Sequence, residues 1–364
     1  MFVRMITMTT LRRKVFKFVG GRILKTGLAA FITAWICAIL DWPALFAVMT
    51  AIVTIEPTAA DSIKKGIIRF PAAAIGAGFA MLFEAFLHQE PITYALAAMF
   101  TLIACHRLHL DAGMLVATLT AVAMIPGTEA HFMESFFIRL GTTMTGIVVS
   151  TAVNFFILPP KFNPMITESV DRLYETAGSL VADVTNINMH KQKQVVAYQR
   201  LSKSLERTYQ LINYQREEWK YRRHSINEIR SFNMLLKKLE YLQKILYHIG
   251  NLIHRAKDEE PLTDKEKELI QKTGLSLSAV FRDPLHQIPA EHYVLIDELD
   301  HVFRRLNQQQ IERESKRYHH HFSAKVVLVY ELLALHDVLE DLDHLCDREL
   351  KAEQLSPKEE PLHE

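Results

Sequence analysis

The first 160 residues of the chain carry too few charged side chains for a water-soluble domain. Only 20 of these positions are Lys, Arg, Asp or Glu, against 63 of the 204 positions that follow. The apolar stretches in this part are also too long for a single buried core, so the pattern predicts a membrane domain followed by a soluble one. Over the whole chain, 42 Lys and Arg face 41 Asp and Glu, which argues against a dedicated nucleic-acid binder.

Six apolar segments follow one another in this charge-poor part. A helix that crosses a membrane needs about 20 mostly apolar residues, so the first, third and sixth segments are long enough and the other three are short. Prolines bound the short segments, and such spans are tolerated where neighbouring helices or a water-filled cavity satisfy the backbone. The segments are 23–40, 42–56, 70–87, 92–105, 112–126 and 137–158.

Positive charge in the loops predicts the orientation of these segments. Lys and Arg gather before the first segment and in the loops after the second and the fourth, whereas the alternate loops carry none. Because cytoplasmic loops carry an excess of Lys and Arg, we expect both chain ends in the cytoplasm and the apolar segments in the lipid bilayer. Residue 61 is expected on the cytoplasmic side and residue 129 outside.

The remaining chain has the pattern of a soluble helical domain, which prolines divide into about five helices. One apolar stripe recurs at intervals of three and four residues, as expected for a packed helix: Leu235, Leu239, Leu242, Leu246, Ile249 and Ile253. The predicted organisation is a basic cytoplasmic N-terminus at 1–22, a membrane domain at 23–158, a cytoplasmic helical domain at 163–350 and a disordered polar tail at 351–364.

The apolar part contains an internal duplication. Residues 40–76 align without gaps on residues 110–146, an offset of 70, with 12 identical pairs in 37 positions. The repeating unit holds three segments, so its two copies (about 23–87 and 92–158) must cross the membrane in opposite senses, as in many secondary transporters. The predicted fold is therefore all-α: a polytopic six-helix membrane bundle built from a 3+3 inverted repeat, followed by a soluble α-helical domain. The alternative is that the duplication built a stable bundle without any transport role.

Polar side chains inside these segments are candidates for function. Thr50 and Thr120 occupy equivalent positions near the middle of the two short helices, and Arg69 and Arg139 occupy equivalent positions at the start of the third helix of each copy. An arginine there can hold a carboxylate by two parallel hydrogen bonds, so we take these four residues as candidate substrate-binding groups. Anchoring at the cytoplasmic surface is the alternative for Arg69.

Four carboxylates lie near the ends of the segments. Glu56 and Glu84 are candidates for proton or ion coupling, because burial can raise the pKa of a carboxyl; reaching to the membrane surface is the alternative. Asp41 and Asp111 precede the two short helices, where capping of the helix start is the leading explanation.

Residues 42–69, WPALFAVMTAIVTIEPTAADSIKKGIIR, resemble the second-span signature of the fusaric-acid-resistance-like membrane proteins. With six segments and a helical domain after them, the chain resembles the bacterial aromatic acid exporter family. The resemblance implies efflux of aromatic carboxylates across the plasma membrane of a bacterial cell. Larger relatives carry two membrane halves in one chain and this chain carries one, which implies a homo-oligomer.

Aromatic side chains near the segment ends, Phe31, Trp35, Trp42 and Phe46, are expected to anchor the helices at the membrane surface. Lining of a path for aromatic acids is the alternative.

Other classes of function lack a sequence signal. The chain has no phosphate-binding loop, nucleophile elbow or dinucleotide fingerprint, so we expect neither an ATP-driven protein nor an enzyme. His336, Glu340 and His344 have metal-ligand spacing but fit a solvated helix face better, and we expect no metal and no cofactor. The leading hypothesis is an exporter of small organic anions working by alternating access. The alternatives are a membrane-anchored sensory or interaction protein and an anion channel on the same fold.

Overall fold

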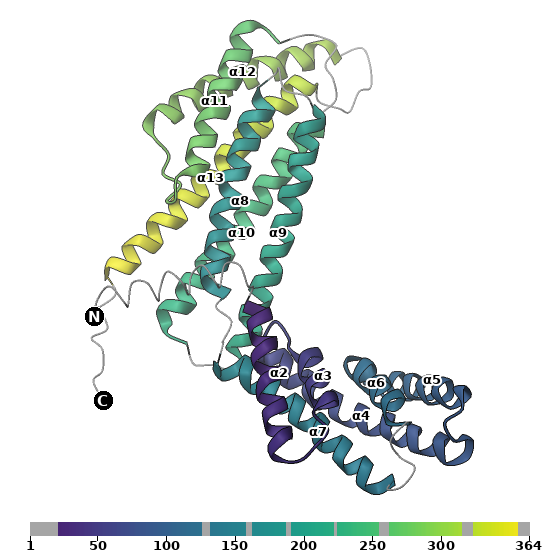
Figure 1. Cartoon of the computed structure of the whole chain (residues 1–364). Helices are drawn as coiled ribbons and strands as arrows, with labels where there is room; N and C mark the ends of the chain where they lie inside the picture. Colours follow the sequence, from purple (N-terminus) through teal and green to yellow (C-terminus); the bar gives the residue numbers. More distant parts are fainter. Residues whose placement is uncertain are drawn as a thin grey trace. The chain divides into compact units, whose positions relative to one another are not determined.

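Every element that the computed structural model describes is helical. The described residues are 21–125, 132–157, 162–186, 191–221, 224–254, 262–314 and 323–355. Within these ranges there are twelve α-helices, one 3-10 turn and one π-helix, and no strand (Figure 1). The predicted all-α class is confirmed. The basic stretch 1–20, the loop at 126–131 and the last residues of the predicted tail, 356–364, lie outside the described residues.

The chain divides into two compact units, one of Met1–Lys161 with Arg216–Arg222, the other of Phe162–Gln215 with Arg223–Glu364. The first unit contains the apolar helices: α2 (Gly21–Ile39), α3 (Ala44–Thr54), α4 (Ala59–Leu87), α5 (Pro91–Arg107), the 3-10 turn η1 (Asp111–Gly113), α6 (Met114–Met124), α7 (Phe132–Ala152) and the π-helix η3 (Val153–Ile157).

Three helices of the first unit are long and apolar enough to cross a membrane, by length and composition alone. They are Gly21–Ile39, Ala59–Leu87 and Met133–Ile157. The two short helices, α3 and α6, have 11 residues each and rise only about 17 Å, well below the ~30 Å of a hydrocarbon core. The three segments expected to be long are therefore long, and two of the three expected to be short are short. The third, α5, has 17 residues and reaches the usual lower limit of about 17 for a span, while the count of six spans stays a prediction.

Helix α4 begins much earlier than the predicted third segment, which started at residue 70. Thr58 is its N-cap, and the Thr58 hydroxyl accepts a 3.0 Å hydrogen bond from the backbone N–H of Asp61. The helix continues through Pro71 to Leu87. The predicted loop around residue 61 was wrong, because the capping signal at Thr58 starts a helix that the apolar pattern alone does not reveal.

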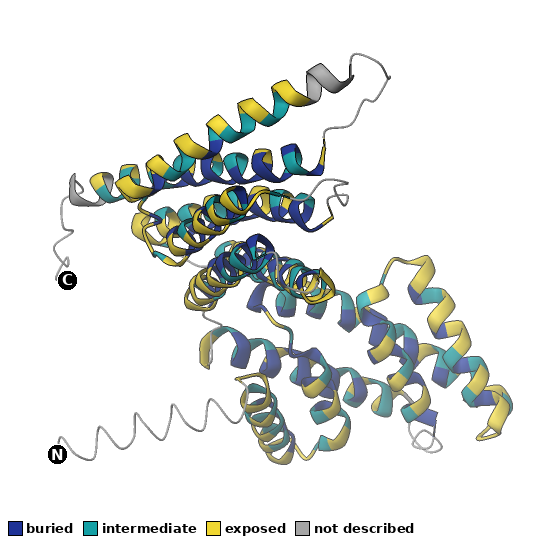
Figure 2. Cartoon of the chain, turned by 90° about the horizontal axis from the view of Figure 1, so that it is seen from above, coloured by how far each residue is buried: buried dark blue, intermediate teal, exposed yellow. Residues whose placement is uncertain are grey.

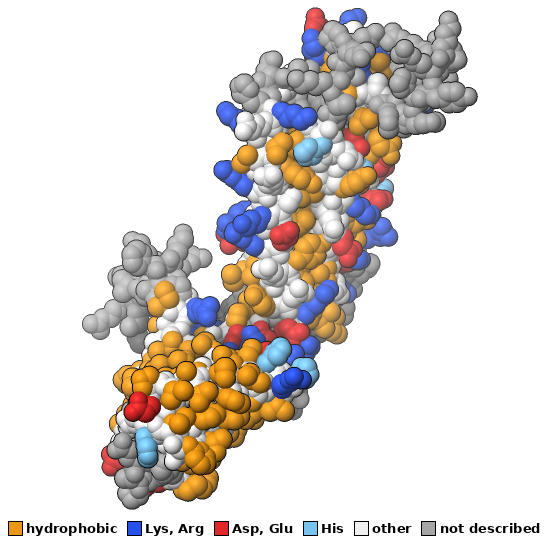
Figure 3. All heavy atoms as spheres, turned by 90° about the vertical axis from the view of Figure 1, so that its right-hand side faces the viewer, with side chains coloured by type: hydrophobic (Ala, Val, Ile, Leu, Met, Phe, Trp, Pro, Cys, Tyr) orange, Lys and Arg blue, Asp and Glu red, His pale blue; other side chains and the backbone are white. Residues whose placement is uncertain are grey.

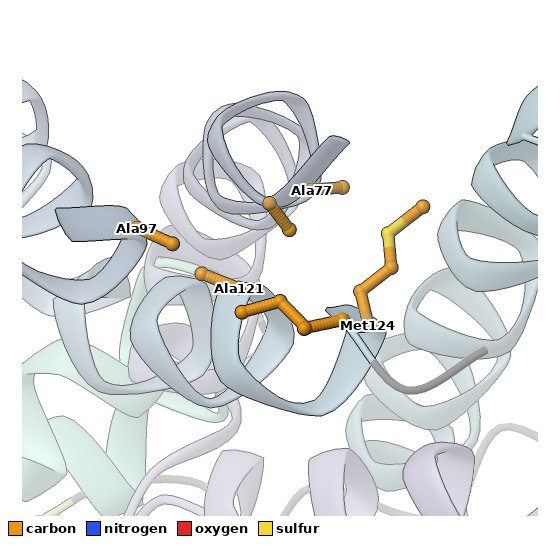
Figure 4. Close-up of a cluster of buried hydrophobic side chains, with 6 residues drawn as sticks. Ala77, Ala97, Ala121 and Met124 are labelled. Atoms are coloured by element: carbon orange, nitrogen blue, oxygen red, sulfur yellow. The ribbon is translucent and has the colours of Figure 1, made fainter. Parts of the chain in front are cut away.

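Small side chains bring the helices of the first unit close together. Ala77 of α4, Ala97 of α5 and Ala121 of α6 are fully buried and meet in one cluster with Met124 (Figure 4). Close approach through small residues is typical of helices in a lipid environment. The outer surface is correspondingly apolar, as the face in Figure 3 shows.

The second unit contains six described helices rather than about five. They are α8 (Phe162–Thr185), α9 (Lys191–Trp219, whose last residues belong to the first unit), α10 (Ile226–His254), α11 (Asp264–Arg282), α12 (Ala290–Glu314) and α13 (Ala324–Leu355). The predicted apolar stripe on α10 is buried from Leu235 to Ile253, which confirms it. Figure 2 colours the described residues by burial and shows that many helices have a buried side and an exposed side. Residues 351–355, predicted as the start of a disordered tail, continue α13 instead.

Candidate functional site

A buried arginine lies against a small cavity between α3, α6 and α7. Arg139 on α7 is only 7% exposed, and its guanidinium carbon lies 3.9 Å from the centroid of the Phe46 ring on α3. Arg139 Nη2 donates a 3.1 Å hydrogen bond to Thr120 Oγ1 on α6. Within the part of the chain that the structure describes, Arg139 Nε and Nη1 have no hydrogen-bond partner. Two buried donor nitrogens therefore remain for a ligand.

The cavity beside Arg139 has a volume of about 20 Å³, which is room for about one water molecule. Its lining is mostly apolar: Phe46, Met49, Thr50, Val53, Val116, Leu119 and Arg139. The structure thus brings three predicted substrate-binding residues together, since Thr50 lines the cavity and Thr120 holds Arg139. Phe46, expected to be a surface anchor, belongs to this site as well.

A positive charge in this position calls for a counter-ion. A guanidinium cannot be deprotonated in a protein, and an uncompensated buried charge costs several kcal/mol. The face of Phe46 offsets part of that cost, by up to about 2 kcal/mol. The arrangement is therefore chemically suited to an anion that brings acceptor oxygens to Nε and Nη1 of Arg139.

The fourth predicted residue, Arg69 on α4, lies in a different environment. It is also 7% exposed, but Arg69 Nη2 lies 2.5 Å from Glu56 Oε1, and Arg69 Nε donates a 3.1 Å hydrogen bond to the carbonyl oxygen of Ala112. Lys65 Nζ lies 2.9 Å from the second oxygen, Glu56 Oε2. Glu56, predicted to couple protons or ions, is thus held between two cations.

Asn154 is a functional candidate that sequence reasoning missed. It is fully buried in the π-helix η3, an element that is frequent at functional sites. Asn154 Nδ2 lies 3.0 Å from the carbonyl oxygen of Glu56 and 2.9 Å from that of Thr58, and Asn154 Oδ1 accepts a 2.7 Å hydrogen bond from Lys25 Nζ. Asn154 therefore fixes the backbone that carries Glu56. The available signal was the offset of 70, which aligns Asn154 with the acidic Glu84.

Two glycines pack helices from different copies of the duplication against each other. A Cβ atom added to Gly76 on α4 would lie 2.2 Å from the carbonyl oxygen of Ala117 on α6. A Cβ atom added to Gly146 on α7 would lie 2.5 Å from the carbonyl oxygen of Ala47 on α3. The offset of 70 relates Gly76 to Gly146 and Ala47 to Ala117. The same close approach therefore occurs twice, at equivalent residues.

The other predicted carboxylates lie outside the Arg139 cavity. Glu84 is buried on α4. Asp41 lies in the turn before α3 with a positive φ of 55°, and α3 begins at Ala44 with Pro43 as its N-cap and no side-chain cap bond. Asp111 begins the turn η1, with its exposed carboxylate 3.4 Å from His106 Nδ1. Asp41 therefore does not make the capping bond that the sequence suggested, because two residues separate it from the helix start at Ala44.

A larger groove, of about 620 Å³, runs between α4 and α7. Its lining is almost entirely apolar and includes Phe70, Phe155 and Phe156. None of its lining residues is charged, so it offers nothing that would select an anion from the surrounding lipid. The Arg139 cavity is the better candidate site despite its small volume.

In the second unit, His336 contacts another histidine rather than Glu340 and His344. His292 Nε2 lies 3.2 Å from His336 Nδ1, and Ser276 Oγ lies 2.8 Å from His292 Nδ1. Burial lowers the pKa of His292 to about 4, with a smaller contribution from His336. Among the described residues, no group of three or more His, Cys, Asp or Glu side chains is arranged to hold a metal ion.

Comparison with known proteins identifies the family. Residues 17–157 match the sequence profile of "Aromatic acid exporter family member 1", which confirms the resemblance to that family. A UPF0421 protein of Bacillus cereus is 45% identical over 334 residues, covering 91% of this chain and 95% of the relative. UPF0421 proteins of Halalkalibacterium halodurans and Staphylococcus saprophyticus are 43% and 33% identical, over 90% and 87% of this chain and 89% and 96% of the relatives. The chain therefore belongs to the UPF0421 family, and its residues 17–157 carry an aromatic acid exporter domain.

Proposed function

We propose that the chain is a plasma-membrane transporter that exports small organic anions, above all aromatic carboxylates, by alternating access. The observation that carries the proposal is Arg139, a buried cation whose Nε and Nη1 lack partners among the described residues and which adjoins a cavity. A carboxylate brings one negative charge and two acceptor oxygens, which a guanidinium binds as a bidentate pair. The aromatic acid exporter domain points to the same class of substrate.

The proposed architecture is six membrane helices, α2 to α7, in two inverted units of three. The paired contacts of Gly76 and Gly146 support it, because each joins the third helix of one unit to the second helix of the other. Inverted repeats of this kind hold their substrate near the bilayer midplane, beside short or broken helices. The short helices α3 and α6 both line the Arg139 cavity.

The orientation is proposed from the charges of the loops, with both ends of the chain in the cytoplasm. A single cysteine in place of Asp61, in a background without Cys37, Cys105 and Cys346, tests it. We expect a membrane-impermeant maleimide to label this cysteine in inside-out vesicles and not in intact cells. Labelling in intact cells would exclude the six-span topology.

Opening of the cavity is the conformational step that transport requires. About 20 Å³ holds a water molecule but not an aromatic acid, so α3 and α6 must separate before a substrate enters. In the open state, the carboxylate would bind Arg139, the Thr50 hydroxyl would donate to it, and apolar side chains such as Leu119 would contact the ring. Since the chain lacks a phosphate-binding loop, an ion gradient or the membrane potential is the proposed energy source.

Efflux of radiolabelled benzoate from preloaded proteoliposomes tests the role of Arg139. Replacing Arg139 with Gln removes a charge-assisted contact of about 1.5–3 kcal/mol, so we expect the apparent affinity to fall roughly 10- to 150-fold. Arg139→Lys keeps the charge but loses the bidentate geometry, so its apparent affinity should lie between those of the wild type and Arg139→Gln. The matched control is Arg107→Gln, which removes an exposed arginine from the end of α5.

The neutral analogue benzamide separates charge recognition from shape recognition. We expect it neither to be exported nor to inhibit benzoate efflux. Benzoate export by Arg139→Gln at the wild-type rate, or equal inhibition by benzamide, would exclude an anion site at Arg139.

A further inference from the structure

Two equivalent arginines have different partners in this chain. Arg69 and Arg139 are related by the offset of 70 and are equally buried. Arg69 Nη2 contacts the carboxylate of Glu56 at 2.5 Å. The offset aligns Glu56 with Pro126, so the second copy has no carboxylate at the corresponding position. The chain supplies a carboxylate to Arg69. Arg139 has a threonine hydroxyl at its Nη2, and its Nε and Nη1 have no partner among the described residues.

The Glu56 carboxylate has the contacts expected of a bound carboxylate ligand, because a cation lies at each of its two oxygens. One oxygen contacts Arg69 Nη2, the other contacts Lys65 Nζ at 2.9 Å, and the side chain is 12% exposed. Arg69 Nη1 has no hydrogen-bond partner in the described part of the chain. The site therefore has a donor that Glu56 does not use, and a ligand with free access could use it.

The position of Glu56 in the chain allows it to move away. It lies in the short connection between α3, which ends at Thr54, and α4, which begins at Ala59. Rotation of its side chain away from Arg69 breaks no helix hydrogen bond. An arriving carboxylate would take the place of the departing one, so the guanidinium would have a counter-ion both before and after binding. The state without a counter-ion costs most and is therefore little populated.

Resting on the function proposed above, we propose that Arg69 is a second carboxylate-binding site of the transport path and that Glu56 is its built-in substitute ligand, displaced by the transported carboxylate. Glu56 and the substrate then compete for the same guanidinium. If Arg69 is vacant for only about 1–10% of the time, its apparent affinity for a carboxylate is weakened by a factor on the order of 10 to 100. Removal of the Glu56 charge should recover that factor.

Equilibrium binding of radiolabelled benzoate to the purified full-length protein in lipid nanodiscs tests this proposal. Four proteins are compared: wild type, Arg139→Gln, Glu56→Gln and the double variant. We expect Arg139→Gln to bind weakly, because Glu56 still occupies Arg69. The double variant should bind on the order of 10- to 100-fold more tightly than Arg139→Gln alone. Glu90→Gln, which neutralises an exposed carboxylate at the start of α5, is the matched control and should change nothing.

The outcomes separate this inference from the proposed function. Wild-type binding by Arg139→Gln would refute the function proposed for Arg139. Binding by the double variant that is no tighter than by Arg139→Gln would refute the role of Glu56 and show the ion pair to be structural only. If Glu56→Gln does not yield a monodisperse protein, Glu56→Asp serves in its place. The shorter side chain keeps the charge but reaches less far toward Arg69, so the competition weakens. A smaller gain in affinity is therefore expected, and its absence refutes the proposal.

Discussion

The packing of Gly76 against α6 can be tested by adding a single methyl group. In Gly76→Ala the new Cβ would lie 2.2 Å from the carbonyl oxygen of Ala117 and 2.9 Å from its carbonyl carbon. Relaxed contacts between carbon and oxygen are about 3.3–3.6 Å. Since the obstructing atoms belong to the backbone of α6, no side-chain rotation can relieve the overlap. Helices α4 and α6 must therefore move apart by roughly 1 Å.

The cost of that separation can be estimated from two opposing effects. A gap of about 0.5–1 Å forfeits a quarter to a half of each dispersion contact, and overpacking of this kind costs about 1–3 kcal/mol. Replacing Gly with Ala inside a helix contributes about 0.5–1 kcal/mol in the other direction. Gly78→Ala on the same helix gains the stability of an alanine without any overlap, because nothing lies within 4 Å of its added Cβ. The difference between the two variants therefore isolates the overlap.

Thermal unfolding in detergent, followed by far-ultraviolet circular dichroism, measures this difference. We expect Gly76→Ala to be less stable than Gly78→Ala by about 1–3 kcal/mol, and Gly146→Ala to behave like Gly76→Ala because its added Cβ would lie 2.5 Å from the carbonyl oxygen of Ala47. Equal stability of Gly76→Ala and Gly78→Ala would refute the close approach of α4 and α6. If Gly76→Ala is destabilised and Gly146→Ala is not, the two glycine contacts are not equivalent, and they no longer support the inverted repeat.

Two further predictions concern the threonines and the second unit. Thr50→Val and Thr120→Val should each lower the apparent affinity for benzoate roughly 5- to 150-fold, from about 1–3 kcal/mol per lost hydroxyl contact, at unchanged protein level; full efflux by the double variant would exclude both hydroxyls from the site. A fragment spanning residues 163–355 should be helical and melt cooperatively, and burial lowers the pKa of His286 and of His292 to about 4. Between pH 4 and 6.5 the unfolded chain then binds more protons than the folded one. The free energy of unfolding should therefore be highest above about pH 6.5 and fall as the pH is lowered toward 4, by up to about 3 kcal/mol per histidine. A profile that does not change with pH would contradict the burial of these histidines as neutral groups.

Periodicity and duplication predicted the parts of the structure that depend on local sequence. The spacing of apolar residues on α10 follows one helix face, and those residues are buried. The offset of 70 selected Thr120 and Arg139, which are joined by a hydrogen bond. Both predictions succeed because a helix converts sequence spacing directly into position on a face.

Contacts between distant residues were not predictable in the same way. Asn154 reaches the carbonyl oxygen of Glu56 across 98 positions of sequence, and nothing in the spacing of either residue indicates the other. The start of α4 was missed for a different reason: the apolar pattern begins at residue 70, whereas the helix is set by the N-cap at Thr58. In the first unit, a search for capping residues would have corrected the boundary, but only coordinates reveal the role of Asn154.

The two arginines show where a duplicated sequence carries information about function. Arg69 and Arg139 became candidate substrate-binding residues because they are identical in the two copies, and that identity predicts the same role for both. Their environments differ at a position where the copies differ, Glu56 in the first copy and Pro126 in the second, and a proline has no charge to offer a buried guanidinium. In the first copy the chain itself supplies a carboxylate to the arginine, whereas in the second copy Nε and Nη1 of Arg139 have no partner among the described residues. An anion from outside the chain is the simplest compensation for the second arginine, so the difference between the copies, rather than their identity, points to the ligand.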